Sequence, residues 1–264
     1  MKSILEYINY KKIVKGIIFA NNSNIKTIVK DELDRLGHTA DLNHIDTSEV
    51  TDMSCLFQVY DLKNRLGSKY EDINPNISNW NVSNVRNMSN MFSYCKSFNC
   101  DISSWNVSNV IQTYNMFCDC KFFNQDISKW SFSKLKDMRY MFCRCTKFNQ
   151  DLNNWDVSKV VNMKGTFFDC ENFNGNISDW DVSNVEDMCE MFKLCYKFNQ
   201  DISGWNVSKV EDMHEMFCNC HKFYCDLSNW NVEKVDLNMS PKDKIFYNSS
   251  MQEYQNYKPL KFRL

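Results

Sequence analysis

Hydrophobic and polar residues follow a pattern that recurs every 25 residues along most of the chain. The clearest sign of the repeat is the tryptophans, which fall at positions 80, 105, 130, 155, 180, 205 and 230. Two phenylalanine series (Phe92 to Phe217 and Phe98 to Phe223) and one cysteine series (Cys95 to Cys220) keep the same step. A fixed spacing of this kind predicts a solenoid, in which each repeat forms one turn and packs mainly against its neighbours.

Two shorter periods follow each other inside each repeat. In residues 102–107, Trp105 and Val107 alternate with polar neighbours, which predicts a short strand. Ser183 and Glu186 then form a capping-box pattern, and apolar residues follow at helical spacing at positions 185, 188, 191, 192 and 195. We therefore expect an α/β fold with a short parallel strand and a short helix in each turn.

Both ends of the repeat array depart from the pattern. Residues 1–40 are predicted to be a helical N-terminal cap, because Ile25, Val29 and Leu33 fall on one helical face and Gly37 is placed to end it. The solenoid is expected over 41–235, with a degenerate first repeat at 45–53, an insertion around 60–75 and seven Trp-centred turns. Residues 236–264 are expected to cap the last turn.

The repeat unit resembles a known family. The pattern Ile-x-x-Trp-x-Val-Ser-x-Val with Met-Phe-x-x-Cys and Phe-Asn, best seen in the run FNQDISGWNVS at 198–208, is similar to the BspA-type leucine-rich repeat. The closest variant is the one of about 25 residues found in bacterial surface proteins and mycoplasma lipoproteins, and the match covers about residues 42–235. The resemblance implies a right-handed, leucine-rich-repeat-like solenoid that acts in adhesion or protein binding, with no shared catalytic residues.

Composition narrows the class of partner. A net charge of −2 gives no electrostatic drive toward nucleic acid, and no apolar run reaches the length of a membrane span. No signal peptide or lipid anchor is legible, so we expect a cytoplasmic monomer by default, and the resemblance adds the cell surface as an alternative. The thirteen cysteines are expected to be buried free thiols, because the Cys95 series lies on an apolar stripe.

Candidate catalytic or metal-binding chemistry is sparse. The sequence contains four histidines and no Ser-His-Asp order, phosphate loop or dinucleotide fingerprint, so we expect neither an enzyme nor a cofactor. One group, His214, Cys218, Cys220 and His221, has metal-ligating residue types. Because Cys pairs recur at the same repeat positions without histidine, as at Cys118 and Cys120, we expect no metal there. A metal-binding or enzymatic protein using residues 214–221 is kept as the alternative function.

Two polar columns accompany the repeat. An aspartate column (Asp101, Asp126, Asp151, Asp201 and Asp226) is expected to hold turns rather than calcium. An asparagine column (Asn99, Asn124, Asn149, Asn174 and Asn199) either bonds backbone groups between turns or is solvated.

The candidate binding surface follows from strand geometry. If Trp and Val point inward, the residues beside each Trp point out of the sheet. We expect the protein to be a non-catalytic repeat protein that binds an unidentified protein, or mediates adhesion, through this exposed face of its parallel sheet. The candidate residues are Asn106, Lys129, Ser131, Asn154, Asp156, Asp179, Asp181 and Asn206.

Overall fold

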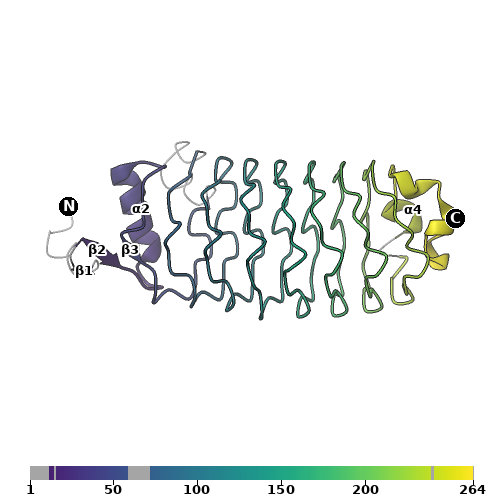
Figure 1. Ribbon diagram of the computed structural model, residues 1–264, viewed down its shortest axis with the longest axis horizontal. Helices are drawn as coiled ribbons and strands as arrows, with labels where there is room; N and C mark the ends of the chain where they lie inside the picture. The colour runs from purple at the N-terminus through teal and green to yellow at the C-terminus, as the bar shows by residue number, and fades with distance from the viewer. Residues whose placement is uncertain (1–11, 15, 59–71, 239–240, 264) are drawn as a thin grey trace.

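The molecule is a row of backbone coils stacked along one long axis (Figure 1). This computed structural model describes residues 12–14, 16–58, 72–238 and 241–263. Strands β1 (Lys12–Val14), β2 (Ile17–Phe19) and β3 (Ile45–Asp46) and helix α2 (Ile25–Leu36) lie at one end. Helix α4 (Lys242–Ile245) lies at the other end, together with the 3-10 turns η2 (Ser250–Gln252), η3 (Gln255–Tyr257) and η4 (Leu260–Phe262). We call each 25-residue segment between these ends a coil.

Adjacent coils are joined by backbone hydrogen bonds between equivalent positions. Parallel bridges link Asp52, Asn87, Gln112, Asp137, Asn162, Asp187 and Asp212 in succession. Beyond each bridge, alternate amides donate to the next coil, as Asn90 N does to the Tyr114 carbonyl (2.7 Å) and Phe92 N to the Met116 carbonyl (2.9 Å). Because these bonds fix each residue against the one a single repeat away, every coil is held in the same register.

The local structure of each coil differs from the strand and helix expected from the sequence. In the described residues 72–238, isolated bridges and turns occupy the coils, and the bridged residue is Gln112 rather than the Trp105–Val107 segment. Residues 185–195 form turns where a helix is predicted. Two features prevent the helix: alternate amides are used between coils, and Glu190 and Leu194 have positive φ (56° and 65°), which a right-handed helix does not accommodate.

Positive φ recurs because each coil contains two successive tight turns. Met91 N bonds the Met88 carbonyl (3.1 Å) and Cys95 N bonds the Phe92 carbonyl (2.9 Å). The third residue of each turn, Asn90 (φ 57°) or Tyr94 (φ 66°), is left-handed, as a type II turn requires. Gly165 takes this position in one coil, where a Cβ would lie 2.2 Å from the Tyr140 ring.

The tryptophans form a buried column through the stack. All seven are between 1% and 5% exposed, and the rings of Trp130 and Trp155 stack at 6.1 Å. Each indole Nε1 donates to a backbone carbonyl of the preceding coil at 2.8–3.3 Å, as from Trp155 to Ile127. The ring therefore joins two coils by packing and by a hydrogen bond, and its predicted burial is confirmed.

Two phenylalanine columns run beside the tryptophans. The rings of Phe57, Phe92, Phe117, Phe142, Phe167, Phe192, Phe217 and Phe246 stack in succession at 5.4–5.7 Å. The second column, from Phe98 to Phe223, stacks at 5.5–6.0 Å. Stacked aromatic pairs add about 0.5–1.5 kcal/mol each beyond area burial, so neighbouring coils stabilise one another strongly.

The cysteine column is a set of buried hydrogen-bond donors. Each Sγ of the Cys95 series donates to a phenylalanine carbonyl of the preceding coil at 2.8–3.0 Å, as from Cys145 to Phe117. Burial raises the pKa of Cys120, Cys145 and Cys170, so these thiols stay protonated and can donate. The thiol is small enough for the core, and it gives a second hydrogen bond to a carbonyl such as that of Phe117, which already accepts the Cys120 N–H of its own turn.

The polar columns are also structural. Asn99, Asn124, Asn149, Asn174 and Asn199 each accept a backbone N–H from the next coil through Oδ1, at 2.7–2.9 Å. In the aspartate column, Oδ1 of Asp101, Asp126, Asp201 and Asp226 accepts the N–H of the serine two residues later. The turn role is confirmed for these four aspartates, whereas Asp151 accepts the Asn176 N–H of the next coil (2.8 Å). The asparagines bond backbone groups between coils.

The N-terminal end is built from strands as well as a helix. β1 pairs antiparallel with β2, and β2 pairs parallel with β3. Among the described residues of the cap predicted at 1–40, the helical prediction therefore holds at α2, and strands occupy 12–14 and 17–19. That helix buries Ile25, Val29 and Leu33 on one face. Residues 1–11 lie outside the described residues, as does most of the insertion predicted around 60–75. In the described part of the chain, none of the helices has the length and apolar character that crossing a bilayer requires.

The C-terminal segment continues the hydrogen bonding of the last coil. Phe217 N donates to the Ile245 carbonyl (2.9 Å) and Leu227 N to the Tyr257 carbonyl (2.8 Å). Phe246 stacks on Phe217 at 5.5 Å and so completes the first phenylalanine column. Tyr224 stands where earlier coils carry the column asparagine, and its ring packs edge-on against Tyr254 (4.8 Å).

Replacing one column ring should cost much of the stability. Trp155→Ala is expected to lower the free energy of unfolding by about 3–5 kcal/mol, because it leaves a cavity between stacked rings and removes one of the two hydrogen bonds that the Ile127 carbonyl accepts. Urea unfolding followed by circular dichroism measures the change. Phe122→Ala is the matched control, since that ring is 58% exposed, and it should cost less than about 0.5 kcal/mol. A loss below about 1 kcal/mol for Trp155→Ala would contradict the enclosed column.

Candidate functional site

The residues beside the tryptophans are exposed, and several of their side chains form hydrogen bonds within turns. All eight predicted binding residues are exposed to solvent. Four of them, Asn106, Asp156, Asp181 and Asn206, accept the N–H of the serine two residues later at 3.0–3.2 Å. The bonds from Ser183 also lower the pKa of the Asp181 carboxyl. We call these exposed positions the Trp row.

The remaining Trp-row residues are Lys129, Ser131, Asn154 and Asp179. Asp179 accepts a hydrogen bond from Asn153 of the preceding coil (2.6 Å). In the described residues the inter-coil bridges run along a different column. The Trp row is therefore not the face of a bridged sheet, which corrects the geometry from which it was predicted.

A second surface follows the bridges themselves. We define the bridge face as each bridged residue together with the residue two positions later. Its pairs are Asn87/Ser89, Gln112/Tyr114, Asp137/Arg139, Asn162/Lys164, Asp187/Cys189 and Asp212/His214. Alternate residues of an extended segment lie on the same side, so the bridge register places the pairs of successive coils next to one another.

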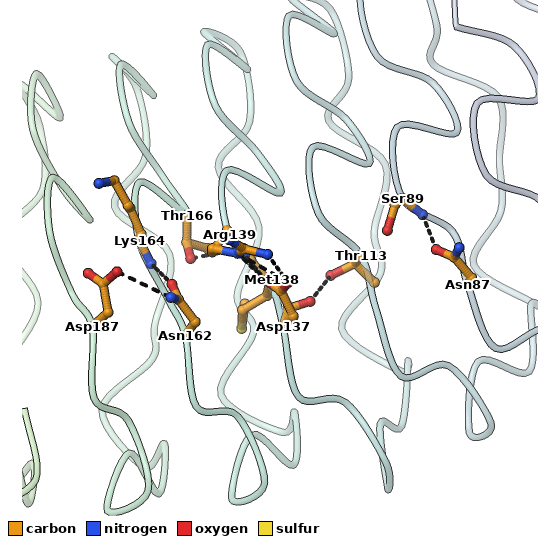
Figure 2. Close-up of polar contacts among 10 residues, drawn as sticks. All are labelled: Asn87, Ser89, Thr113, Asp137, Met138, Arg139, Asn162, Lys164, Thr166 and Asp187. Atoms are coloured by element: carbon orange, nitrogen blue, oxygen red, sulfur yellow. Dashed lines mark hydrogen bonds and ion pairs between the residues drawn. The ribbon is translucent and has the colours of Figure 1, made fainter.

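Hydrogen bonds hold the bridge face in place (Figure 2). Asn162 accepts the Lys164 N–H (2.9 Å) and donates through Nδ2 to Asp187 of the next coil (3.2 Å). Arg139 forms an ion pair with Asp137 at 2.6 Å, and its guanidinium lies 5.1 Å from the centre of the Tyr114 ring. Packing and ion pairing therefore fix the large outward side chains before any partner binds.

The bridge face brings together three metal-ligating side chains that the sequence analysis missed. Single ligand atoms of Asp187, Cys189 and Asp212 all lie within 4.8 Å of one another. Burial, and then the charge of Asp212, raise the pKa of the Cys189 thiol to about 12. Burial is also the main cause that raises the pKa of the Asp187 carboxyl. Asp187 and Asp212 are 25 residues apart in the sequence and meet because the bridge pairs them, which no local motif indicates.

The four residues of the predicted alternative site do not form such a group. The Cys220 thiol is buried and donates to the Phe192 carbonyl (2.8 Å), so it faces the core. The His221 ring stacks on Tyr196 at 5.2 Å. Among the described residues, the group with converging ligand atoms is the one at Asp187, Cys189 and Asp212. Cys220 therefore belongs to the core column, and the alternative function at 214–221 stays a prediction.

Comparison with known proteins assigns the chain to a protein family. A family model described as "Mycoplasma protein of unknown function, DUF285" matches the chain twice, at residues 60–168 and 145–257. These matches together span more than half of the chain, which therefore belongs to that family. Neither the curated proteins nor the solved structures contain a match.

The Asp187 carboxyl on the bridge face should make stability depend on pH with a defined sign. Because the pKa of Asp187 is raised in the fold, its ionisation lowers stability as the pH rises through about 4, the unfolded value. Asp187→Asn in metal-free buffer should therefore raise the Tm by about 1–3 °C at pH 7. The gain should vanish below about pH 3, where the wild-type carboxyl is protonated.

Thermal unfolding at several pH values measures this difference, with Asp126→Asn as the control. Bonds from Ser128 lower the pKa of Asp126, so that substitution should lose stability at neutral pH and none in acid. A loss for Asp187→Asn that is the same at pH 3 and pH 7 would contradict the electrostatic explanation.

Proposed function

We propose that the protein is a non-catalytic repeat protein that binds another protein, as a monomer, through the bridge face. We further propose that the stack of coils is a right-handed, leucine-rich-repeat-like solenoid of the BspA type. The repeat motif supports this proposal, as does the regular hydrogen bonding between equivalent positions of adjacent coils.

The variation of the bridge face from coil to coil carries the proposal. The outer positions are Ser89, Tyr114, Arg139, Lys164, Cys189 and His214, so six coils carry six different side chains, of which all but Cys189 are partly exposed. The intervening inward positions are Met88, Thr113, Met138, Met163, Met188 and Met213, which are nearly constant. The inward residues can be nearly constant because their role is to stack on one another. If the outward residues served only to contact solvent, we would expect small polar side chains that repeat from coil to coil. Different outward side chains on one frame are what recognition of a specific surface requires.

The chemistry of the face suits a protein partner. Tyrosine and arginine dominate the energetics of many protein interfaces, and Tyr114 and Arg139 already contact one another. Side chains that are ordered beforehand lose less entropy on binding. Five steps of about 4.8 Å between the six coils extend the face over roughly 24 Å, a length that fits within a standard interface of about 800 Å² per partner.

The Trp row supports a binding role less well. Its position after each Trp is occupied by Asn or Asp in six of the seven coils, from Asn81 to Asn231, because the turn needs a side-chain acceptor there. Its position before each Trp does vary, from Lys129 to Gly204. We therefore place the main contact on the bridge face and use the Trp row as the control surface.

Charge reversal on the two surfaces tests the proposal. A photo-crosslinking residue at position 114 is expected to capture a partner, and the same residue at position 154 is not. With that partner purified, Arg139→Glu should weaken the Kd at least tenfold, which is about 1.4 kcal/mol. Lys129→Glu makes the same charge change on the exposed Trp row and should leave the Kd unchanged. If Lys129→Glu weakens the complex and Arg139→Glu does not, the bridge face is not the binding surface.

A further inference from the structure

Two adjacent coils place four metal-ligating residue types at neighbouring positions. Asp187 and Asp212 are bridged directly, and Cys189 and His214 follow them by two residues on the same side of the chain. The four side chains therefore form a two-by-two arrangement across the coils. Three of them, Asp187, Cys189 and Asp212, already have ligand atoms within 4.8 Å of one another, and His214 lies outside that distance.

The other coils carry different chemistry at the same positions. Asp137 is neutralised by Arg139 two residues later, and Asn162 is followed by Lys164. At Asp187 and Asp212 the residue two positions later is a cysteine or a histidine. Lys164 of the preceding coil lies nearby, and the charges of Asp187 and Asp212 are among the causes that raise its pKa. Lys193, further along the face, is paired with Glu190 and Glu215.

Two buried polar groups at this place are not explained by the fold. Cys189 is only 4% exposed and its Sγ lies against both carboxylates. The thiols of the Cys95 column donate to carbonyl groups, but in the described part of the chain the Cys189 thiol forms no such bond. The Nδ1 atom of His214 is buried and, among the described residues, has no hydrogen-bond partner. Buried polar atoms of this kind are uncommon and call for an explanation, and a bound ion is one.

We propose that Asp187, Cys189 and Asp212 bind one divalent transition-metal ion of the zinc type. A thiolate with carboxylate oxygens is a donor set for zinc and cobalt rather than for calcium or magnesium. Zn–S and Zn–O bonds of about 2.3 and 2.1 Å require the three ligand atoms to move closer together by an ångström or so. On binding, the Cys189 thiol releases its proton to solvent and the thiolate coordinates the ion. His214 occupies the neighbouring position and is the fourth protein group that a rotation of its ring would bring to the metal.

This site shares only His214 with the constellation at 214–221, its three converging ligands lie outside that constellation, and it runs against the absence of metal expected from the sequence. Its two halves are 25 residues apart and meet only through the register of the coils. The ion would link two coils beside the core and replace the repulsion between the two carboxylates with attraction. The proposal stands independently of the partner-binding function, because it concerns a bound ion and not a protein surface.

Metal titration of the full chain tests the site. The protein is stripped with a chelator under reducing conditions and titrated with Zn²⁺ alone in competition with a chromophoric chelator. One equivalent should bind saturably, and Ca²⁺ should not displace it. With Co²⁺ alone, the complex should show thiolate-to-cobalt charge-transfer absorption, which identifies cysteine as a ligand.

Matched variants separate this site from the other thiols. Cys189→Ser and Asp212→Asn should each weaken Zn²⁺ binding at least tenfold, and Cys189→Ser should abolish the charge-transfer band. Cys225→Ser and Asp137→Asn are the controls. The Cys225 thiol has a single carboxylate neighbour, Asp201, at 3.5 Å, and Asp137 occupies the same bridge column as Asp187, so neither control should change the affinity.

The folded state of every variant is checked by circular dichroism without metal, and either ligand variant alone decides the question if the other does not fold. Unchanged zinc affinity in Cys189→Ser, an equal loss in Cys225→Ser, or no saturable binding by the wild-type chain would each overturn the proposal.

Discussion

The register between adjacent coils is the constraint on which the rest of the structure depends. Each coil donates alternate backbone amides to the next one, and this places every side chain beside its equivalent 25 residues away. Only then can the Trp and Phe rings stack at 5.4–6.5 Å and the Cys145 thiol reach the Phe117 carbonyl. A single coil has none of these contacts, so it cannot offset the entropy of ordering its own backbone. Stability therefore comes from the interfaces between coils.

The same register determines where chemistry can arise. Functional groups are assembled down a column, from residues 25 apart, and not from a local motif. Asp187 and Asp212 meet because the bridge pairs them, and Tyr114 and Arg139 meet because they hold equivalent places in adjacent coils. The inward positions must remain nearly constant for the stack to close. The outward positions of the bridge face are free to change from coil to coil, and this freedom makes that face suitable for recognition.

The sequence predicts the features that depend on the period and on hydrophobicity. The burial of Trp155 and Val157 (3% and 1% exposed) follows from their alternation with polar residues, and the turn role of Asp101 follows from side-chain chemistry. The predicted helix at 185–195 was wrong, because apolar residues at helical spacing can also face one core from successive tight turns. Spacing alone does not reveal which amides are used between coils.

The positions of the bridge face and of its metal-ligating group could not be predicted from the sequence either, because they too depend on which residues are bridged between coils. Alternation around Trp105 placed the sheet beside the tryptophans, whereas the bridges pass through Gln112. The group at His214 and Cys220 was judged by closeness along the chain, but Cys220 faces the core and the converging ligands come from two coils. Only the bridge column, known from the structure, identifies which columns point outward together.

The register is tested most directly by removing a whole repeat and comparing the result with an incomplete removal. Deleting residues 161–185 takes out 25 positions and joins equivalent points of neighbouring coils, so the columns continue unbroken. Circular dichroism and urea unfolding of this variant should show a cooperatively folded protein. Deleting residues 161–184 removes 24 positions and shifts every later residue by one place, so the rings and bridges no longer align and the fold should be lost beyond the junction. Equal stability of the two deletion variants would contradict the account, because it would mean that contacts between equivalent positions do not hold the molecule together.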